Sequence, residues 1–247
     1  MPTVLITGCS SGFGLETAHL FLDQGWKVVA GMRKPDPGVL PRSERLCVLP
    51  LDVTDPGSVT RAIAQAGDID VLVNNAGFGA PSPLELTSLQ TARSLFETNT
   101  LGAFTLIQAV LPQFRQRGAG VVINVSSSVT LKALPVIGMY RASKAAVNAL
   151  TESLALEVAP FGVRVHLVLP GRSPETRFGE HARVHMQGLD HPDYAPLVQG
   201  FISSARSDAG LVTYASDVAA AVWRAATDPT CPARIPAGAD AEQWMAE

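Results

Sequence analysis

The sequence predicts an α/β domain in which helices cover both faces of a parallel sheet. Two observations support this class. Segments of strand length alternate with segments of helical periodicity along the chain, and the strand segments are continuous apolar runs rather than alternating ones. No linker, repeat or low-complexity segment interrupts this order, so residues 1–247 are expected to form a single domain.

The elements follow in order from short apolar runs with β-branched residues and from apolar residues at helical spacing. We expect strands at 3–7, 27–32, 45–51, 71–75, 120–126, 163–170 and 233–236. We expect helices at 13–24, 55–67, 87–117 (which could be two pieces), 139–159 and 217–228. Gly25 should end the first helix, Asp55 should cap the second, and Ser216 should cap the last. The stretch of about 171–215 is rich in Gly, Pro, Arg, His and Ser, and we expect an irregular functional segment such as a lid.

Bulk composition narrows the class of protein. The chain has 247 residues, 47% of them hydrophobic and 17% charged, which allows a sizeable core. A net charge of −3 without a lysine/arginine block argues against nucleic-acid binding. The three cysteines are far apart in the sequence, which favours a reducing, cytoplasmic compartment over a disulfide framework. We expect neither a signal peptide nor a membrane span, because no basic segment precedes the first strand and the longest apolar stretch, 101–112, is too short.

A glycine cluster joins the first strand to the first helix. The segment TGCSSGFG, residues 7–14, places Gly8, Gly12 and Gly14 at this turn. Glycine permits positive φ and lets a ligand approach the backbone, and a helix N-terminus offers free N–H groups to a pyrophosphate. An ordinary glycine-rich turn is the alternative, but the position between a first strand and a first helix favours a dinucleotide site.

The segment YRASK, residues 140–144, places Tyr140 and Lys144 one turn apart on one helix face. An ammonium group beside a phenol of pKa about 10 is expected to lower the phenol pKa and make it a proton donor near neutral pH. By itself the spacing favours the simpler interpretation, an interface tyrosine and a surface lysine, because a tyrosine and a lysine at this spacing are common by chance. The interpretation therefore depends on the rest of the chain.

A series of motifs in the right order carries a family resemblance. They are TGCSSGFG at 7–14, LDV at 51–53, NNAG at 74–77, Asn99, the serines at 126–128, YRASK at 140–144 and PG at 170–171. Together they resemble the classical short-chain dehydrogenase/reductase family over nearly the whole chain. The resemblance implies a Rossmann-type, doubly wound parallel sheet, a nicotinamide dinucleotide cofactor and a small carbonyl or alcohol substrate. It also implies a homodimer or homotetramer that assembles through helices at 100–116 and 139–159.

The resemblance implies four catalytic residues. Tyr140 would be the general acid/base that protonates the carbonyl oxygen, and Lys144 would lower its pKa and bind the nicotinamide ribose. Ser127 would hydrogen-bond the substrate oxygen, while the serines on either side of it would be structural. Asn99 would perturb its helix and hold a water of a proton relay, although a mid-helix asparagine is often only solvated.

The cofactor is predicted to be NADP(H). Dinucleotide folds that select NAD carry an acid after the second strand, but Met32 stands there and Arg33 and Lys34 follow. Arginine offers a bidentate contact to a 2′-phosphate, so Arg33 is the expected main contact; the alternative is that both cations only solvate a loop. By resemblance, the cofactor-binding residues are Gly8, Ser10, Ser11, Gly12, Phe13, Gly14, Arg33, Lys34, Asp52, Val53, Asn75, Ala76, Gly77, Tyr140, Lys144, Pro170 and Gly171.

Some of these residues have a simpler reading, and one segment departs from the family pattern. Asp52 could lie near the adenine or simply stabilise a turn, and Asn74 is expected to stabilise the central strands. In PGRSPET, 170–176, the threonine that should grip the nicotinamide amide comes one position late. His181 and His185 lie four residues apart, yet no acid accompanies them, so no metal site is expected. The arginines of 171–215 could favour an anionic substrate or could be solvated.

The expected function is an NADP(H)-dependent oxidoreductase that interconverts a ketone or aldehyde and an alcohol. A catalytically idle NADP(H) sensor on the same fold is the first alternative. An epimerase or dehydratase of the extended relatives would usually have a longer chain with an added substrate domain. A dehalogenase relative would be expected to lose the glycine loop and to replace Lys144, and neither has happened.

Overall fold

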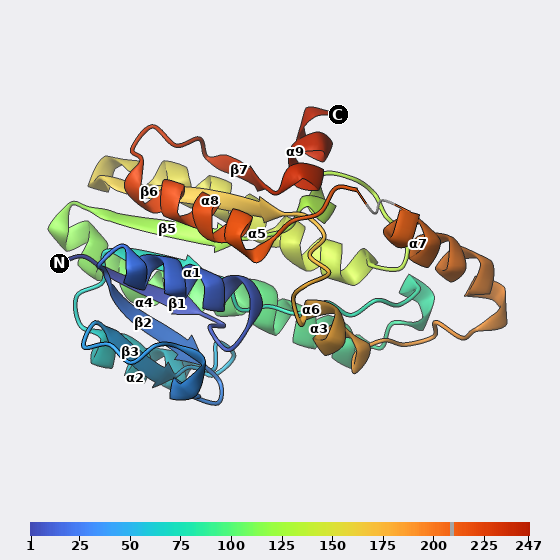
Figure 1. Ribbon diagram of the computed structural model, residues 1–247, viewed down its shortest axis with the longest axis horizontal. Coiled ribbons are helices and arrows are strands. Elements are labelled where there is room, and N and C mark those ends of the chain that lie inside the picture. Colours follow the sequence, from blue (N-terminus) through green and yellow to red (C-terminus); the bar gives the residue numbers. More distant parts are fainter. Residues whose placement is uncertain (208–209) are drawn as a thin grey trace.

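A single parallel sheet forms the centre of the molecule in a computed structural model. The structure describes residues 1–207 and 210–247, and it describes the side chains of all residues except 204–209. The seven strands of the sheet are ordered β3-β2-β1-β4-β5-β6-β7, and every neighbouring pair is parallel. Figure 1 shows all of them running in one direction. The predicted α/β class is confirmed. The strands are β1 Thr3–Thr7, β2 Lys27–Met32, β3 Leu46–Pro50, β4 Val71–Asn74, β5 Gly120–Val125, β6 Val163–Pro170 and β7 Arg234–Ala237.

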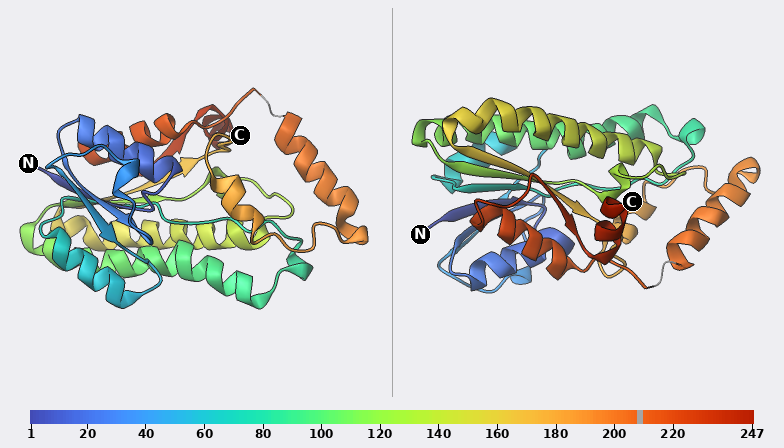
Figure 2. Two further views of the ribbon diagram at one scale, coloured as in Figure 1. Left: turned by 60° about the horizontal axis from the view of Figure 1, so that its bottom comes forward. Right: turned by 90° about the horizontal axis from the view of Figure 1, so that it is seen from above.

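Helices cover the two faces of this sheet. They are α1 Gly12–Asp23, α2 Pro56–Ala66, α3 Leu89–Phe96, α4 Gly102–Arg117, α5 Gly138–Val158, α6 Phe178–Arg183, α7 Ala195–Ser207, α8 Ala215–Thr227 and α9 Ala239–Ala246. In the right-hand view of Figure 2, α4 and α5 lie on one face and α1 and α8 on the other. The continuous apolar strands are thus explained, because both of their sides are buried.

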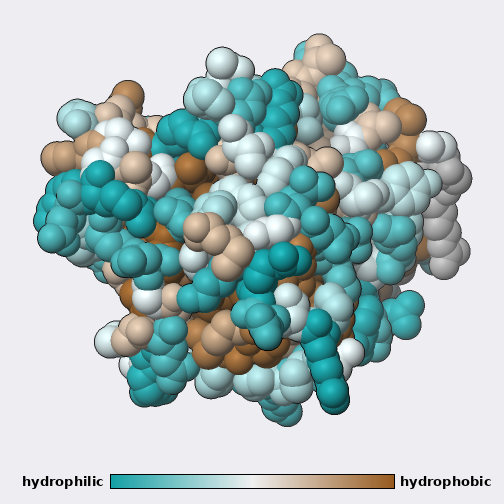
Figure 3. Space-filling view, turned by 60° about the vertical axis from the view of Figure 1, so that its left-hand side comes forward, coloured by the Kyte–Doolittle hydropathy of each residue, from teal (hydrophilic) through white to brown (hydrophobic). Residues whose placement is uncertain are grey.

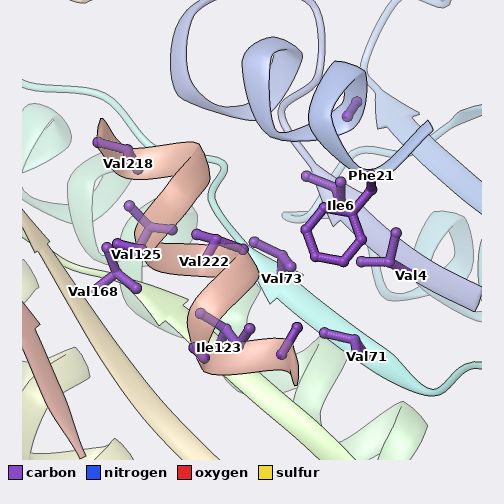
Figure 4. Packing of buried hydrophobic residues seen from close by; sticks show 14 of the residues in the cluster. Val4, Ile6, Phe21, Val71, Val73, Ile123, Val125, Val168, Val218 and Val222 are labelled. Carbon is purple, nitrogen blue, oxygen red and sulfur yellow. The ribbon is translucent and has the colours of Figure 1, made fainter. Parts of the chain in front are cut away.

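The α1/α8 face shows how the strands and helices interlock. Phe21 of α1 and Val222 of α8 are fully buried against Ile6, Val73 and Ile123 of three adjacent strands (Figure 4). Burial of such side chains stabilises the fold by roughly 1.5–3 kcal/mol each. This packing holds α1, and with it the glycine loop, against the sheet. The side of the molecule away from α7 is mainly hydrophilic, with apolar residues in patches between (Figure 3).

Most predicted elements are present, with three differences. The predicted helix at 87–117 is two helices, α3 and α4, joined by a π-helical turn at Glu97–Leu101. The predicted Ser216 cap is wrong, because α8 already begins at Ala215 and Ser216 lies inside it. Tyr214 is the capping residue, and its N–H donates to the Asp217 carboxylate. The segment 171–215 is also more regular than expected, since it contains α6 and α7.

The strand order reverses at β1 and β4, whose carboxyl ends lie side by side. Loops that leave these two strands in opposite directions open a crevice, which is the usual ligand site of doubly wound sheets. Within the described part of the chain, no helix combines the length and apolarity needed to cross a bilayer.

Candidate active site

The glycine loop has the shape that its sequence predicts. Gly8 and Gly12 have φ values of +74° and +58°, in the left-handed region that favours glycine. A side chain at Gly14 would overlap the Gly8 carbonyl oxygen and stand 2.5 Å from Asn75 Nδ2. These glycines therefore let α1 start directly against the loop, with Gly12 as its first residue.

The first turn of α1 can receive an anion. Ser11 precedes the helix with extended backbone, and within the described chain its side chain makes no capping hydrogen bond. The first N–H groups of a helix lack intrahelical partners and carry partial positive charge. Ser10 is exposed, while Ser11 and Gly12 are half-buried; Phe13 packs on the core below the loop. The residues present thus fit a bound pyrophosphate.

A threonine that the motif analysis did not single out holds this loop to the next one. The Thr7 hydroxyl accepts hydrogen bonds from the Asn75 and Ala76 N–H groups, each at 2.9 Å. Asn75 Nδ2 donates in return to the Thr7 carbonyl at 2.9 Å. The carboxyl ends of β1 and β4 are thereby joined across the crevice. A threonine at the end of the first strand, directly before the glycine loop, was the available signal.

Tyr140 and Ser127 lie together at the catalytic end of the crevice. Tyr140 is 9% exposed, and burial raises its pKa to about 12, although a hydrogen bond with the Ser127 side chain acts in the opposite direction. The expectation that the pKa of Tyr140 falls is therefore wrong for this structure. The physical reason is that removal of the phenol from water disfavours its charged form.

Lys144 is buried behind the tyrosine. Its ammonium group donates to the Val125 carbonyl oxygen at 2.9 Å, and burial lowers its pKa to about 8. The same group stands 3.3 Å from the position that a Cβ of Gly77 would occupy. The glycine of NNAG therefore lets the backbone pass close to this ammonium group, where a side chain would crowd it.

Asn99 sits in the π-helical turn, so the expected helix perturbation is present. Its Nδ2 donates to the Phe78 carbonyl and to the Ser143 hydroxyl, and its Oδ1 accepts from the Phe78 N–H, all at 3.0 Å. The side chain thus holds the loop after β4 against α5. These bonds use both hydrogens of the Asn99 side-chain amide. A water of a proton relay would therefore have to bind to a group other than Asn99 Nδ2.

Buried amides connect the central strands, as predicted for Asn74. Asn74 Nδ2 donates to Asn124 Oδ1, and Asn124 Nδ2 donates to the Thr151 hydroxyl, both at 2.8 Å. These bonds join β4, β5 and α5. Ser126 adds a bond from its hydroxyl to Asn148 Oδ1 at 2.5 Å and is structural, as expected.

The predicted adenosine end of the site lies after β2 and β3. Met32 is buried, whereas Arg33 and Lys34 are exposed. Burial raises the pKa of Asp52, but hydrogen bonds from Thr54 and the positive charge of Arg33 outweigh it, so the net pKa lies below the usual range. The Thr54 bonds show that Asp52 stabilises a turn, which was one of its two readings.

Val53, which follows Asp52, is buried, and a Cβ at Gly102 would collide with it. Its side chain is directed toward α4, so a cofactor contact would come from its main chain.

The segment after β6 reaches the glycine loop. Pro170 is buried, and Gly171 N–H donates to the Thr213 hydroxyl at 2.9 Å. Thr176 lies against Gly12, at 3.4 Å from the position of a Cβ there. A pocket between the glycine loop and this segment is lined by Ser10, Ser11, Gly12, Leu15, Glu16, Glu175, Thr176, Arg177 and Ala215.

Aromatic side chains surround the tyrosine. The Phe178 ring of α6 is 5.7 Å from the Tyr140 ring, and the Phe78 ring is 4.5 Å from the His185 ring. Arg177 is instead exposed and pairs with Glu180. In the described residues no group of three or more metal-ligating side chains was found.

The chain belongs to the short-chain dehydrogenase family, whose model matches residues 2–185. A 3-ketodihydrosphingosine reductase of Bacteroides thetaiotaomicron is 39% identical over 196 residues, which cover 78% of this chain and 71% of that protein. Retinol dehydrogenase 8 of Bos taurus is 42% identical over 181 residues, which cover 68% of this chain and 58% of that protein. The chain is thus an oxidoreductase of this family.

Solved structures agree with this assignment. A short-chain dehydrogenase from Streptomyces avermitilis has a TM-score of 0.87 at 32% identity, covering 100% of this chain and 92% of that one. One from Burkholderia cenocepacia, solved in complex with NADP, has a TM-score of 0.77 at 29% identity over 99% and 91% of the two chains. One from Burkholderia phymatum, solved with NAD, has a TM-score of 0.81 at 26% identity over 95% and 88%. The Rossmann-type fold is confirmed, and this fold accepts either dinucleotide.

Proposed function

We propose that the protein is an NADP(H)-dependent oxidoreductase that interconverts a ketone or aldehyde and an alcohol, with Tyr140 as general acid/base. The observation that carries this proposal is the contact of Tyr140 with Ser127, with the buried Lys144 one turn further along α5 and close to Gly77. An idle sensor would not need this group of side chains, which supports the enzyme reading over the sensor.

The residues have complementary tasks in the reduction. When bound, NADPH supplies a hydride to the carbonyl carbon. The raised pKa of Tyr140 keeps its phenol protonated at neutral pH, so the phenol can donate its proton to the carbonyl oxygen. Ser127 donates a hydrogen bond to the same oxygen as charge develops there. Lys144, when protonated, favours the phenolate that remains.

Preference for NADP(H) over NAD(H) is supported at the adenosine end. The exposed Arg33 follows β2, and no acid precedes it at the position of Met32. An arginine there offers paired N–H donors to a 2′-phosphate. A separate observation concerns the segment that follows β6. Among the described residues, Ser173 Oγ is buried without a hydrogen-bond partner, which fits a polar group of a bound molecule.

An apolar substrate is favoured over an anionic one. The ring of Phe178 faces Tyr140, whereas the nearby Arg177 is exposed and paired with Glu180. The named substrates of the two relatives above, a ketosphingoid base and retinol, both carry long apolar chains. We therefore propose a carbonyl compound with an extended apolar group.

We also propose that the protein forms a homodimer or homotetramer and is located in the cytoplasm. Phe104 of α4 is 39% exposed, and Leu156 of α5 is 80% exposed, so these two helices offer apolar contacts for a homodimer or homotetramer. The cysteines are free, which supports a reducing, cytoplasmic setting. Light scattering on the eluting protein measures the assembly, and a monomeric mass at micromolar concentration would contradict it.

The first experiment is NADPH consumption by the purified protein. The panel contains long-chain ketones and aldehydes, short ketones and oxo-acids, each with NADPH and NADH. Tyr140→Phe removes the proton donor, and Tyr214→Phe is the matched control because Tyr214 is exposed at the start of α8. We expect turnover that is at least about a hundredfold slower only in Tyr140→Phe. Turnover that survives this change would refute the proposed role, and NADPH binding without any turnover would favour the sensor.

A further inference from the structure

The two ends of the segment 171–213 meet at one polar cluster. Gly171 and Arg172 directly follow β6, and Thr213 precedes α8. The Thr213 N–H donates to the Arg172 carbonyl at 2.9 Å, so the ends are paired through their backbones. Asp240, in the first turn of α9, joins them. We call Gly171, Arg172, Thr213 and Asp240 the lid anchor.

The carboxylate of Asp240 serves both ends of the segment. Its Oδ2 accepts from the Arg172 N–H at 2.6 Å. Its Oδ1, at 2.7 Å, is one of two acceptors for the single proton of the Thr213 hydroxyl, beside the Ala237 carbonyl oxygen at 2.8 Å. The Thr213 oxygen in turn accepts from the Gly171 N–H at 2.9 Å. Thr213 is fully buried, whereas Gly171, Arg172 and Asp240 are half-buried, so the bonds are partly shielded from water and leaving the Thr213 hydroxyl without a partner is costly.

Two glycines make room for this arrangement. A Cβ at Gly171 would overlap the Asp240 carboxylate, and a Cβ at Gly238 would overlap the Thr213 hydroxyl. Gly238 also has a φ of +98°, which turns the chain from β7 into α9. Gly171 thus has a reason to be glycine that is independent of any cofactor.

The same short helix reaches a second loop of the site. Lys132, between Ser127 and Tyr140 in the sequence, pairs with Glu247 at 2.9 Å and lies over the Trp244 ring at 5.6 Å. These side chains are half-exposed, so this contact is weak compared with the buried anchor. Figure 1 and the right-hand view of Figure 2 both place α9 at the carboxyl end of the sheet.

We propose that Asp240 and Thr213 are positioning residues for the reaction. They fix the chain where it leaves β6, and that chain carries Thr176 onto the glycine loop and Phe178 onto Tyr140. Loss of the anchor would let this chain shift while the sheet and the catalytic tyrosine stay in place. The inference rests on the proposed function, since it concerns the same site.

The test compares Asp240 with Asp228, two carboxylates that each accept from a backbone N–H and lie beside a threonine hydroxyl. Asp240→Ala and Thr213→Val remove the anchor, whereas Asp240→Asn can still accept from the Arg172 N–H and so serves as the rescue variant. Asp228→Ala is the control, because Asp228 also accepts from a backbone N–H at 2.8 Å and a threonine hydroxyl at 2.6 Å, but before β7 at the opposite end of the sheet. For each variant we would measure kcat and KM with NADPH, the thermal midpoint, and hydrogen exchange of the Gly171 and Arg172 amides.

The expected result is a fall in kcat/KM of about tenfold for Asp240→Ala and Thr213→Val. Exchange should be faster at the two amides only in these variants. Asp240→Asn should stay close to wild type in both kcat/KM and amide exchange. If Asp240→Ala does not fold, Thr213→Val carries the same comparison. Equal kcat/KM and equal amide exchange in Asp240→Ala and Asp228→Ala would overturn the inference. A wild-type protein that neither binds nor oxidises NADPH would instead refute the proposed function, and exchange would still decide on the anchor.

Discussion

Replacement of Gly14 by alanine tests the closeness of the glycine loop to the loop after β4. The new Cβ would stand 2.5 Å from Asn75 Nδ2 and 2.9 Å from the Gly8 carbonyl carbon, and it would overlap the Gly8 carbonyl oxygen. Alanine is a better helix former than glycine by about 1 kcal/mol, which favours the variant. Overpacking against fixed backbone costs typically 1–3 kcal/mol, so the net effect is destabilising by up to roughly 2 kcal/mol.

The same shift should move the glycine loop away from its bound position. We expect Gly14→Ala to weaken NADPH binding about tenfold or more, measured by quenching of tryptophan fluorescence. Gly200→Ala in α7 is the matched control, because among the described side chains no atom lies within 4 Å of its Cβ position, so the helix preference is the main expected effect. Denaturant unfolding should therefore show a loss for Gly14→Ala and a small gain for Gly200→Ala. A Gly14→Ala protein with wild-type stability and affinity would refute the reasoning.

Three further predictions concern the cofactor, the buried lysine and the aromatic cover. Arg33→Ala should weaken NADPH binding about tenfold without changing NADH binding, and Lys34→Ala should do less; calorimetry that shows equal losses for the two cofactors would contradict the selectivity. Burial lowers the pKa of Lys144 to about 8 from 10.5, so between these values the unfolded chain binds more protons and the free energy of unfolding should rise with pH. The raised pKa of Tyr140 reverses this trend above about pH 10. Denaturant unfolding of the wild type and of Lys144→Met from about pH 8 to 10 measures this rise in the free energy of unfolding, which should be missing in the variant. An equal rise in both proteins would contradict the burial of Lys144 as its cause. Phe178→Ala should raise KM for an apolar ketone about tenfold and change kcat less, and an unchanged KM would place the substrate elsewhere.

The sequence was informative wherever a structural rule is local. Continuous apolar runs predict buried parallel strands, and all seven expected strands are present in the sheet. The positive φ and close packing of the glycine loop were predicted from the place of its glycines between the first strand and the first helix, because glycine is the residue that permits both. The spacing of Tyr140 and Lys144 likewise placed both side chains on one helix face, and the structure shows that this face of α5 is buried.

Boundaries and short elements were less predictable. Tyr214 caps α8, although Ser216 is a more common type of capping residue. The residue at which a helix starts depends on the backbone conformation of the preceding segment, which the sequence pattern does not show. The helix α9 spans only 8 residues, which is too short for helical periodicity to identify. The helix perturbation at Asn99 was expected from the family resemblance, but its form as a π-helical turn at Glu97–Leu101 is a matter of backbone hydrogen bonds, which composition does not show.

The order of strands and helices, the glycine loop and the family of this protein are determined by the sequence itself, because each depends on neighbours in the chain. The tertiary structure alone decided which groups meet: Thr7 with Asn75, Asn99 with Ser143, and Asp240 with Thr213. It also decided the pKa direction of Tyr140, which spacing predicted wrongly, because burial by the rest of the chain outweighs any local neighbour. Contacts between residues far apart in sequence, and the removal of water from them, are properties of the assembled sheet.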